Sequence, residues 1–96
     1  LDVNSSWVNA EYARELAISG DMTRAGEISL NAINLQPLDI EALVTRGIIL
    51  RRAGDNATAT QAFDAALAIN PNHAIALAGK GAVQGDVASL ERAISI

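Results

Sequence analysis

The sequence predicts an all-α fold, a helical solenoid of antiparallel helix pairs, and three observations support this prediction. First, a pattern of 34 residues recurs along the chain. Aligned pairs include Leu16 with Leu50, Gly20 with Gly54, and Pro37 with Pro71. Second, 50% of the residues are apolar but only 3% are aromatic, as expected for closely packed helices rich in small residues. Third, the connections are short, so consecutive helices must run antiparallel. Such stacked units bury together a face that no single unit can bury.

Capping residues and helix breakers divide the first unit into two helices. The polar cluster 4–6 can accept hydrogen bonds from the first turn of a helix that ends at Gly20. Asp21 then caps a second helix over 22–35. This helix ends before Pro37, because proline disfavours helical geometry at the residue that precedes it.

The second unit repeats this order of caps and breakers. Asp39 is the expected cap of a helix over 40–52, which ends before Gly54. Asp55 then caps another helix, and Pro71 closes the unit as Pro37 closes the first. The first two units therefore contribute two helices each.

The third unit departs from the period. Asn72 is the expected cap of a helix over 73–84, and a last helix is expected over 87–96. The turn at Gly85 comes a few residues too early for the period. Either the third unit is short, or a loop is missing from the sequence between Gln84 and Leu90.

The second unit also carries a specific residue pattern. It has small residues at Gly47, Ala59 and Ala66, an aromatic residue at Phe63, and a closing proline at Pro71. This pattern resembles the tetratricopeptide repeat, a helix–turn–helix unit of about 34 residues. The small residues allow close approach of two backbones, and the aromatic ring fills the gap beneath the next repeat.

The resemblance covers nearly the whole chain and implies a single domain over 1–96 that forms a short right-handed superhelix. The expected repeats are 6–39, 40–73 and 74–96. The first repeat departs from the pattern at Asn9, where an apolar residue is expected, and at Ser29, which replaces the aromatic residue. These departures are typical of a looser terminal repeat.

The resemblance implies that the first helices of successive repeats line a concave groove, which holds an extended peptide or a helix of a partner. The 34-residue alignment places candidate residues in rows on one face of these helices. The candidate binding residues are Trp7, Ala10, Arg14, Glu41, Val44, Ile48, Arg51, Arg52, Ile75 and Ala78. This surface is apolar in the middle, and its arginines can bind a carboxylate. We therefore expect a protein or peptide partner with an apolar or amphipathic segment, which can also carry acidic residues.

Two considerations limit this expectation. The same side chains could instead pack against helices of a longer array, and the sequence leaves the two interpretations open. Members of the family that bind chaperone tails hold a terminal carboxylate with lysine, asparagine and arginine side chains. The corresponding positions here are Ala10, Arg14, Thr45, Ile75 and Gly79. Only Arg14 could serve, so this class of ligand is not expected.

Residues suited to catalysis or metal binding are scarce. The chain has no cysteine and one histidine, which disfavours thiolate chemistry and a zinc site. His73 stands at a helix start, and we interpret it as a capping or solvent-facing residue. The segment 79–81 lacks the first glycine and the preceding strand of a phosphate loop. Glu11 and Glu15 are typical of a solvated helix face. We expect neither an enzyme nor a cofactor.

Net charge and hydropathy further restrict the classes of partner that we expect. The formal net charge of −4 disfavours binding to nucleic acid, which requires a basic surface. No apolar run approaches the roughly 18 residues of a membrane span, so direct membrane insertion is not expected. The absence of cysteine fits a cytoplasmic or a periplasmic protein. Because the chain begins with Leu1 and not methionine, we interpret it as a fragment or a processed product.

The predicted function is that of a non-catalytic protein-interaction scaffold, in the assembly of a multiprotein complex. The turn 53–55 resembles those of bacterial members of the family, including members that assist pilus and secretion assembly. Two alternatives remain open. The chain could be the regulatory arm of a larger enzyme, or a self-associating element, a homo-oligomer in which exposed Leu90 and Ile94 bring copies together.

Overall fold

The computed structural model describes residues 5–84 and residue 94, and this part of the chain contains five long α-helices. They are α1 (Ser6–Ile18), α2 (Met22–Leu35), α3 (Ile40–Arg52), α4 (Asn56–Ile69) and α5 (Ala74–Gln84). These bounds agree with the helices predicted from the sequence to within about a residue. The expected last helix over 87–96, the question of a missing loop and the exposure of Leu90 lie outside the described residues. The side chain of Ile94 is 85% exposed.

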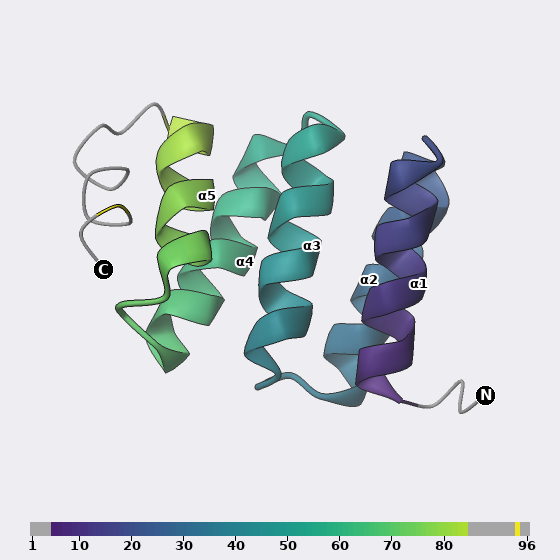
Figure 1. The fold of residues 1–96 in the computed structure, drawn as a ribbon, viewed down its shortest axis with the longest axis horizontal. Helices are drawn as coiled ribbons and strands as arrows, with labels where there is room; N and C mark the ends of the chain where they lie inside the picture. The colour runs from purple at the N-terminus through teal and green to yellow at the C-terminus, as the bar shows by residue number, and fades with distance from the viewer. Residues whose placement is uncertain (1–4, 85–93, 95–96) are drawn as a thin grey trace.

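The helices form two layers. Figure 1 shows α1, α3 and α5 side by side in one layer, with α2 and α4 in a second layer behind them. Each connection reverses the chain, so α1 pairs with α2 and α3 pairs with α4 in antiparallel fashion. This arrangement confirms the predicted all-α fold of antiparallel helix pairs. The right-handed superhelical turn stays a prediction.

Aspartate caps and glycine turns set the helix boundaries, as the sequence indicates. Asp21, Asp39 and Asp55 each accept hydrogen bonds from N–H groups in the first turn of the helix that follows. Gly20 and Gly54 have φ angles of +95° and +87°, in the left-handed region that favours glycine after a helix end. The short connections therefore follow directly from local sequence.

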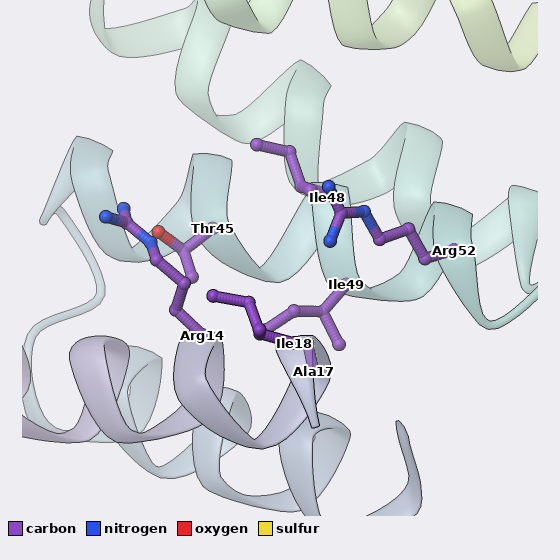
Figure 2. A pocket seen from close by; sticks show the side chains of 7 residues that line it. All are labelled: Arg14, Ala17, Ile18, Thr45, Ile48, Ile49 and Arg52. Carbon is purple, nitrogen blue, oxygen red and sulfur yellow. The ribbon is translucent and has the colours of Figure 1, made fainter. Parts of the chain in front are cut away.

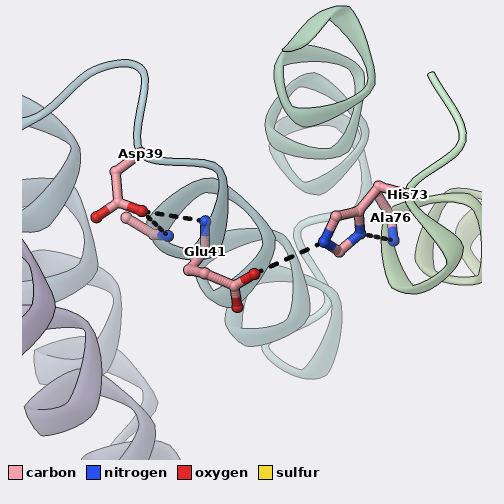
Figure 3. Close-up of polar contacts among 5 residues, drawn as sticks. Asp39, Glu41, His73 and Ala76 are labelled. Atoms are coloured by element: carbon pink, nitrogen blue, oxygen red, sulfur yellow. Dashed lines mark hydrogen bonds and ion pairs between the residues drawn. The ribbon is translucent and has the colours of Figure 1, made fainter. Parts of the chain in front are cut away.

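The cap of α5 differs from the prediction. Asn72 does not cap this helix, because its N–H donates to Oδ1 of Asn70 at 3.1 Å and the residue belongs to the turn. His73 takes the capping role, since its Nδ1 accepts a hydrogen bond from the N–H of Ala76 at 3.2 Å (Figure 3). The prediction of Asn72 as the cap was therefore wrong, whereas the interpretation of His73 as a capping residue is confirmed.

An aromatic ring fills the space where α4 meets α3 and α5, which we call the second junction. Phe63 of α4 is fully buried there. A Cβ atom added to Gly47 of α3 would lie 2.6 Å from Cε1 of Phe63, and one added to Gly79 of α5 would lie 2.3 Å from its Cζ. Both glycines are therefore required for the ring to fit. This confirms the predicted roles of Phe63 and Gly47, and it shows that Gly79 is also a packing residue.

The equivalent space between α2 and α3, the first junction, is filled by a polar group. Ser29 aligns with Phe63 at the 34-residue period and is 1% exposed. Nη1 of Arg46, on α3, donates to the carbonyl oxygen of Gly26 at 2.8 Å and to Oγ of Ser29 at 3.0 Å. Burial lowers the pKa of Arg46, and the carboxylate of Asp55 opposes this shift. A hydrogen-bonded guanidinium group thus lies beside Ser29, the residue that aligns with Phe63.

Candidate functional site

A hollow opens between α1 and α3, the first two helices of the front layer (Figure 2). Its volume is about 230 Å³. The lining residues are Arg14, Ala17 and Ile18 from α1 and Thr45, Ile48, Ile49 and Arg52 from α3. Figure 2 shows the side chains of Ile18 and Ile49 together between the two arginines, with the side chain of Ile48 directed away from them. We refer to these seven residues as the hollow.

Helical spacing explains why these side chains meet. Residues three and four apart lie on one face of a helix, so Arg14 lies beside both Ala17 and Ile18. The same spacing brings the four α3 residues together. Ala17, Thr45 and Ile49 are buried and form the floor. The small methyl group of Ala17 leaves room between the helices, and Ile18 stays 65% exposed at the rim.

The hollow is positively charged although the chain as a whole is acidic. Its lining contains two arginines and no carboxylate. Nη1 of Arg14 lies 3.4 Å from Oε1 of Glu11, but both side chains are largely exposed, so this ion pair holds the arginine only weakly. Arg52 lies in the last turn of α3, where the helix dipole favours a cation. It has no ion pair or hydrogen bond within the described part of the chain.

This combination suits a particular kind of ligand. Buried methyl and methylene groups on the floor can accept an apolar side chain from outside, and guanidinium groups at the rim can bind a carboxylate in bidentate fashion. Among the described residues no cluster of histidine and carboxylate side chains could hold a metal ion. None of the described helices combines the length and apolar character needed to cross a membrane.

The structure brings only some of the predicted site residues together. Arg14, Ile48 and Arg52 line the hollow, whereas Arg51 is exposed on the same turn but lies outside it. Three further predicted residues are exposed near the N-terminal ends of α1, α3 and α5, away from the hollow: Trp7, Glu41 and Ile75. Ala78 is half-buried. Oε1 of Glu41 lies 3.7 Å from Nε2 of His73, which links the starts of α3 and α5 (Figure 3).

Two predicted residues do not face outward. Ala10 is 8% exposed and packs with Ala32 and Ala42 between α1, α2 and α3. Val44 is 4% exposed and belongs to the core cluster that contains Phe63. Neither side chain is presented to a partner in this structure, because the helices that pack on them cover both.

Four residues of the hollow were absent from the predicted site: Ala17, Ile18, Thr45 and Ile49. Their signal was the helical spacing itself. Ala17 and Ile18 lie one turn beyond Arg14, and Ile49 and Thr45 lie within one turn of Ile48. The 34-residue alignment also pairs Ala17 with Arg51 and Ile18 with Arg52, so extending the predicted rows to the first unit would have included two of them.

Comparison with known protein sequences identifies one distant relative. No protein-family model matches the chain. The chain is 36% identical over 67 residues to the DnaJ homolog subfamily C member 7 homolog of Schizosaccharomyces pombe. The match covers 70% of this chain but only 14% of the relative, so most of that protein has no counterpart here.

Solved structures give broader matches at low sequence identity. The chain is similar to the MamA protein with a TM-score of 0.84 and 18% identity, covering 99% of this chain and 56% of that one. It is also similar to the second TPR of Spaghetti (RPAP3), solved with the HSP90 peptide SRMEEVD, with a TM-score of 0.80 and 14% identity. This match covers 98% of this chain and 87% of that one. The chain thus has the tetratricopeptide-repeat-like structure that its residue pattern resembles.

Proposed function

We propose that the chain is a non-catalytic protein-interaction module that holds a segment of a partner in the hollow between α1 and α3. The segment carries an apolar side chain, which contacts the floor, and an acidic side chain, which binds Arg14 or Arg52. The hollow itself supports this proposal most directly, since it combines an apolar floor with two arginines and no carboxylate. In this proposal the units 6–39, 40–73 and 74–96 act as one scaffold.

The similar structures agree with this type of activity. One of them, the second TPR of Spaghetti, was solved with the peptide SRMEEVD, which contains three carboxylate side chains. At 14% identity the likeness concerns the fold, so the residues that would bind a peptide here have to be argued from this chain. Arg14 and Thr45 meet in the hollow, but Gly79 packs against Phe63 and offers no side chain. We therefore expect an internal acidic segment as ligand and no clamp for a terminal carboxylate.

The binding test uses two labelled synthetic peptides, one alternating leucine with glutamate and one alternating leucine with lysine. Fluorescence anisotropy should show saturable binding of the glutamate peptide to the chain and none of the lysine peptide. Arg52→Glu should weaken binding of the glutamate peptide by about tenfold, because the substitution replaces attraction by repulsion at the rim. Arg14→Glu should act in the same direction.

Arg51 provides the matched control. It is the neighbour of Arg52, is also exposed, and does not line the hollow. Arg51→Glu changes the net charge by the same amount and should weaken binding by less than about threefold. Equal losses for Arg51→Glu and Arg52→Glu would show that only overall charge matters and would contradict the proposal. Circular dichroism should confirm that both variants keep their helices.

The apolar lining of the hollow can be tested at Ile48. This residue lines the hollow and is half-buried against the edge of the core cluster that contains Phe63. Ile48→Ser should therefore weaken binding of the leucine–glutamate peptide and lower stability somewhat, while the chain stays folded by circular dichroism. Val44 is unsuitable for the same test, because it lies in the core and a polar side chain there would destabilise the fold. Unchanged binding by a folded Ile48→Ser variant would show that the peptide does not contact the apolar lining at Ile48 and would contradict the proposed binding mode.

Binding of SRMEEVD provides a further comparison. With only Arg14 among the clamp positions, we expect the chain to bind this peptide more weakly than an internal acidic segment without a free carboxyl end. Stronger binding, lost when the carboxyl end is amidated, would show a terminal-carboxylate site. Self-association remains the alternative function, and sedimentation over a concentration series tests it. A mass that rises with concentration would favour it.

A further inference from the structure

A neighbouring side of α1 carries a second recess, which the proposed peptide site does not include. Its volume is about 310 Å³, and all of its lining residues belong to α1: Trp7, Val8, Glu11, Tyr12 and Glu15. We call this surface the outer face of α1. Trp7 is 68% exposed and Tyr12 is 43% exposed, so two aromatic rings meet solvent beside two carboxylates. Two large aromatic side chains exposed side by side on one helix are typical of a surface that binds a partner.

The 34-residue period shows what this face is built to receive. Val8, Tyr12 and Glu15 align with the α3 residues Ala42, Arg46 and Ile49. Ala42 and Ile49 lie in buried clusters with residues of both α1 and α2, and Arg46 donates hydrogen bonds to Ser29 and Gly26 of α2. The outer face of α1 is therefore the equivalent of an α3 surface that packs against α1 and α2 in the same molecule.

The chemistry of the outer face differs from that of its counterpart on α3. Ile49, which is 2% exposed, is replaced by Glu15, and Thr45 is replaced by Glu11. Glu11 is paired weakly with Arg14, whereas Glu15 has no ion pair within the described part of the chain. A helix that packs here has to place cations, and not methyl groups, opposite these carboxylates.

The aromatic rings of Trp7 and Tyr12 also favour a cationic ligand. The guanidinium carbon of Arg24 lies 5.7 Å from the ring centroid of Tyr12, and Nη2 of Arg24 donates a hydrogen bond to the hydroxyl group. This contact shows that the face already holds one cation by a cation–π interaction. Among the described residues Trp7 has no such contact, although its larger ring binds cations better.

From these observations we infer that the outer face of α1 is a docking site for a basic amphipathic helix of a partner protein. The helix lies along α1 as α2 lies along α3. Its apolar side chains contact Val8 and Tyr12, and its lysine or arginine side chains contact Trp7, Glu11 and Glu15. This site shares no lining residue with the hollow, although Glu11 at its edge pairs with Arg14 of the hollow. The hollow lies between α1 and α3 and favours acidic segments.

Trp7 is the single tryptophan of the chain and reports directly on this site. The probe is a synthetic helical peptide without aromatic residues, with leucine on one face and lysine on the flanks. Titration should change the emission of Trp7 in a saturable way, and calorimetry should give the same affinity. A peptide with glutamate in place of lysine should produce no change. Absence of saturable binding of the lysine peptide by both methods would overturn the inference.

Charge variants test the location. Glu15→Lys should weaken binding of the lysine peptide by about tenfold and Glu15→Gln by about threefold. Glu27 on α2 is exposed and lies outside the outer face, so Glu27→Lys is the matched control and should change affinity less than about twofold. Equal effects of Glu15→Lys and Glu27→Lys would contradict the site.

Two more measurements distinguish the outer face of α1 from the hollow and from a self-association surface. Arg52→Glu, which disrupts the hollow, should leave binding of the lysine peptide intact, so failure of the peptide-binding proposal would not affect this one. Sedimentation of the chain alone should give a constant mass. If the mass and the emission of Trp7 both changed with protein concentration, the occupant would be a second copy of the chain, and the inference of a basic partner helix would be wrong.

Discussion

The two junctions of the molecule occupy equivalent positions in the 34-residue period but are filled by opposite kinds of groups. At the second junction the ring of Phe63 lies against Gly47 and Gly79. At the first junction Ser29 stands where the ring would be, and the guanidinium of Arg46 fills the space with two hydrogen bonds. The same arrangement of helices therefore accommodates either a buried aromatic ring, as at Phe63, or a hydrogen-bonded arginine, as at Arg46, between successive helix pairs.

The residues around each junction explain the difference. The aromatic wedge requires glycine on both neighbouring helices, and the first junction has Ala13 and Thr45 at the positions that align with Gly47 and Gly79. Thr45 also forms part of the floor of the hollow. A ring at Ser29 would thus compete for space with side chains that shape the candidate binding site. The polar junction and the hollow occur at the same place in the fold.

The largest difference between the junctions should appear on truncation of their central side chains. Phe63→Ala removes a fully buried ring and should lower the free energy of unfolding by about 3–5 kcal/mol. Ser29→Ala removes one hydroxyl group and should cost about 1 kcal/mol. Urea denaturation followed by circular dichroism measures both. A Phe63→Ala variant no less stable than Ser29→Ala would break the comparison.

Glycine substitutions test whether the ring requires the small residues. Alanine normally stabilises a helix interior by about 1 kcal/mol relative to glycine. Gly79→Ala should instead destabilise the chain by about 1–3 kcal/mol, because the new Cβ would lie 2.3 Å from Phe63.

Gly26 on α2 is the control for this substitution. A Cβ added there would meet no heavy atom within 4 Å, so Gly26→Ala should be neutral or stabilising in the same denaturation experiment. If both variants gained stability, the second junction would have more room than the structure shows.

Loss of the Arg46 hydrogen bonds should have an intermediate effect on the free energy of unfolding. Arg46→Met keeps the apolar stem but removes the donors to Ser29 and Gly26, and should cost about 1–2 kcal/mol. Lys80 aligns with Arg46, yet its Nζ pairs at 2.6 Å with a half-exposed Asp64 because the ring fills the interior. Lys80→Met should therefore cost less than about 1 kcal/mol. Thermal unfolding measures both variants. If Lys80→Met lost more stability than Arg46→Met, the stabilising role of Arg46 at the first junction would be contradicted.

Local sequence signals were sufficient for the helices but not for the junctions. Aspartate caps and glycine turns act within a few residues, so the bounds of α1 to α4 followed from Asp21, Asp39 and Asp55 with their neighbours. The cap of α5 was misassigned to Asn72 because Asn70 and His73 offered competing side-chain acceptors in the same turn. Short-range competition of this kind depends on turn geometry, which the residue types alone do not specify.

The site was predicted only in part, for a related reason. The period identified Arg14, Ile48 and Arg52, which line the hollow. It also selected Val44, which the neighbouring helices cover. Which residues of a helix are covered depends on how far the helices are rotated toward each other, and a sequence period does not encode that rotation. For the same reason, the sequence did not predict that the side chain of Arg46 on α3 forms hydrogen bonds with Gly26 and Ser29 on α2.

Chemical-shift mapping of the isotope-labelled chain with the leucine–glutamate peptide tests the proposed binding site most directly. We expect the largest amide shifts in the last turns of α1, around Arg14 and Ile18, and along α3 from Thr45 to Arg52, with small shifts in α2 and α4. Shifts concentrated in α2 or α4, or no shifts at a saturating peptide concentration, would contradict a partner segment held between α1 and α3.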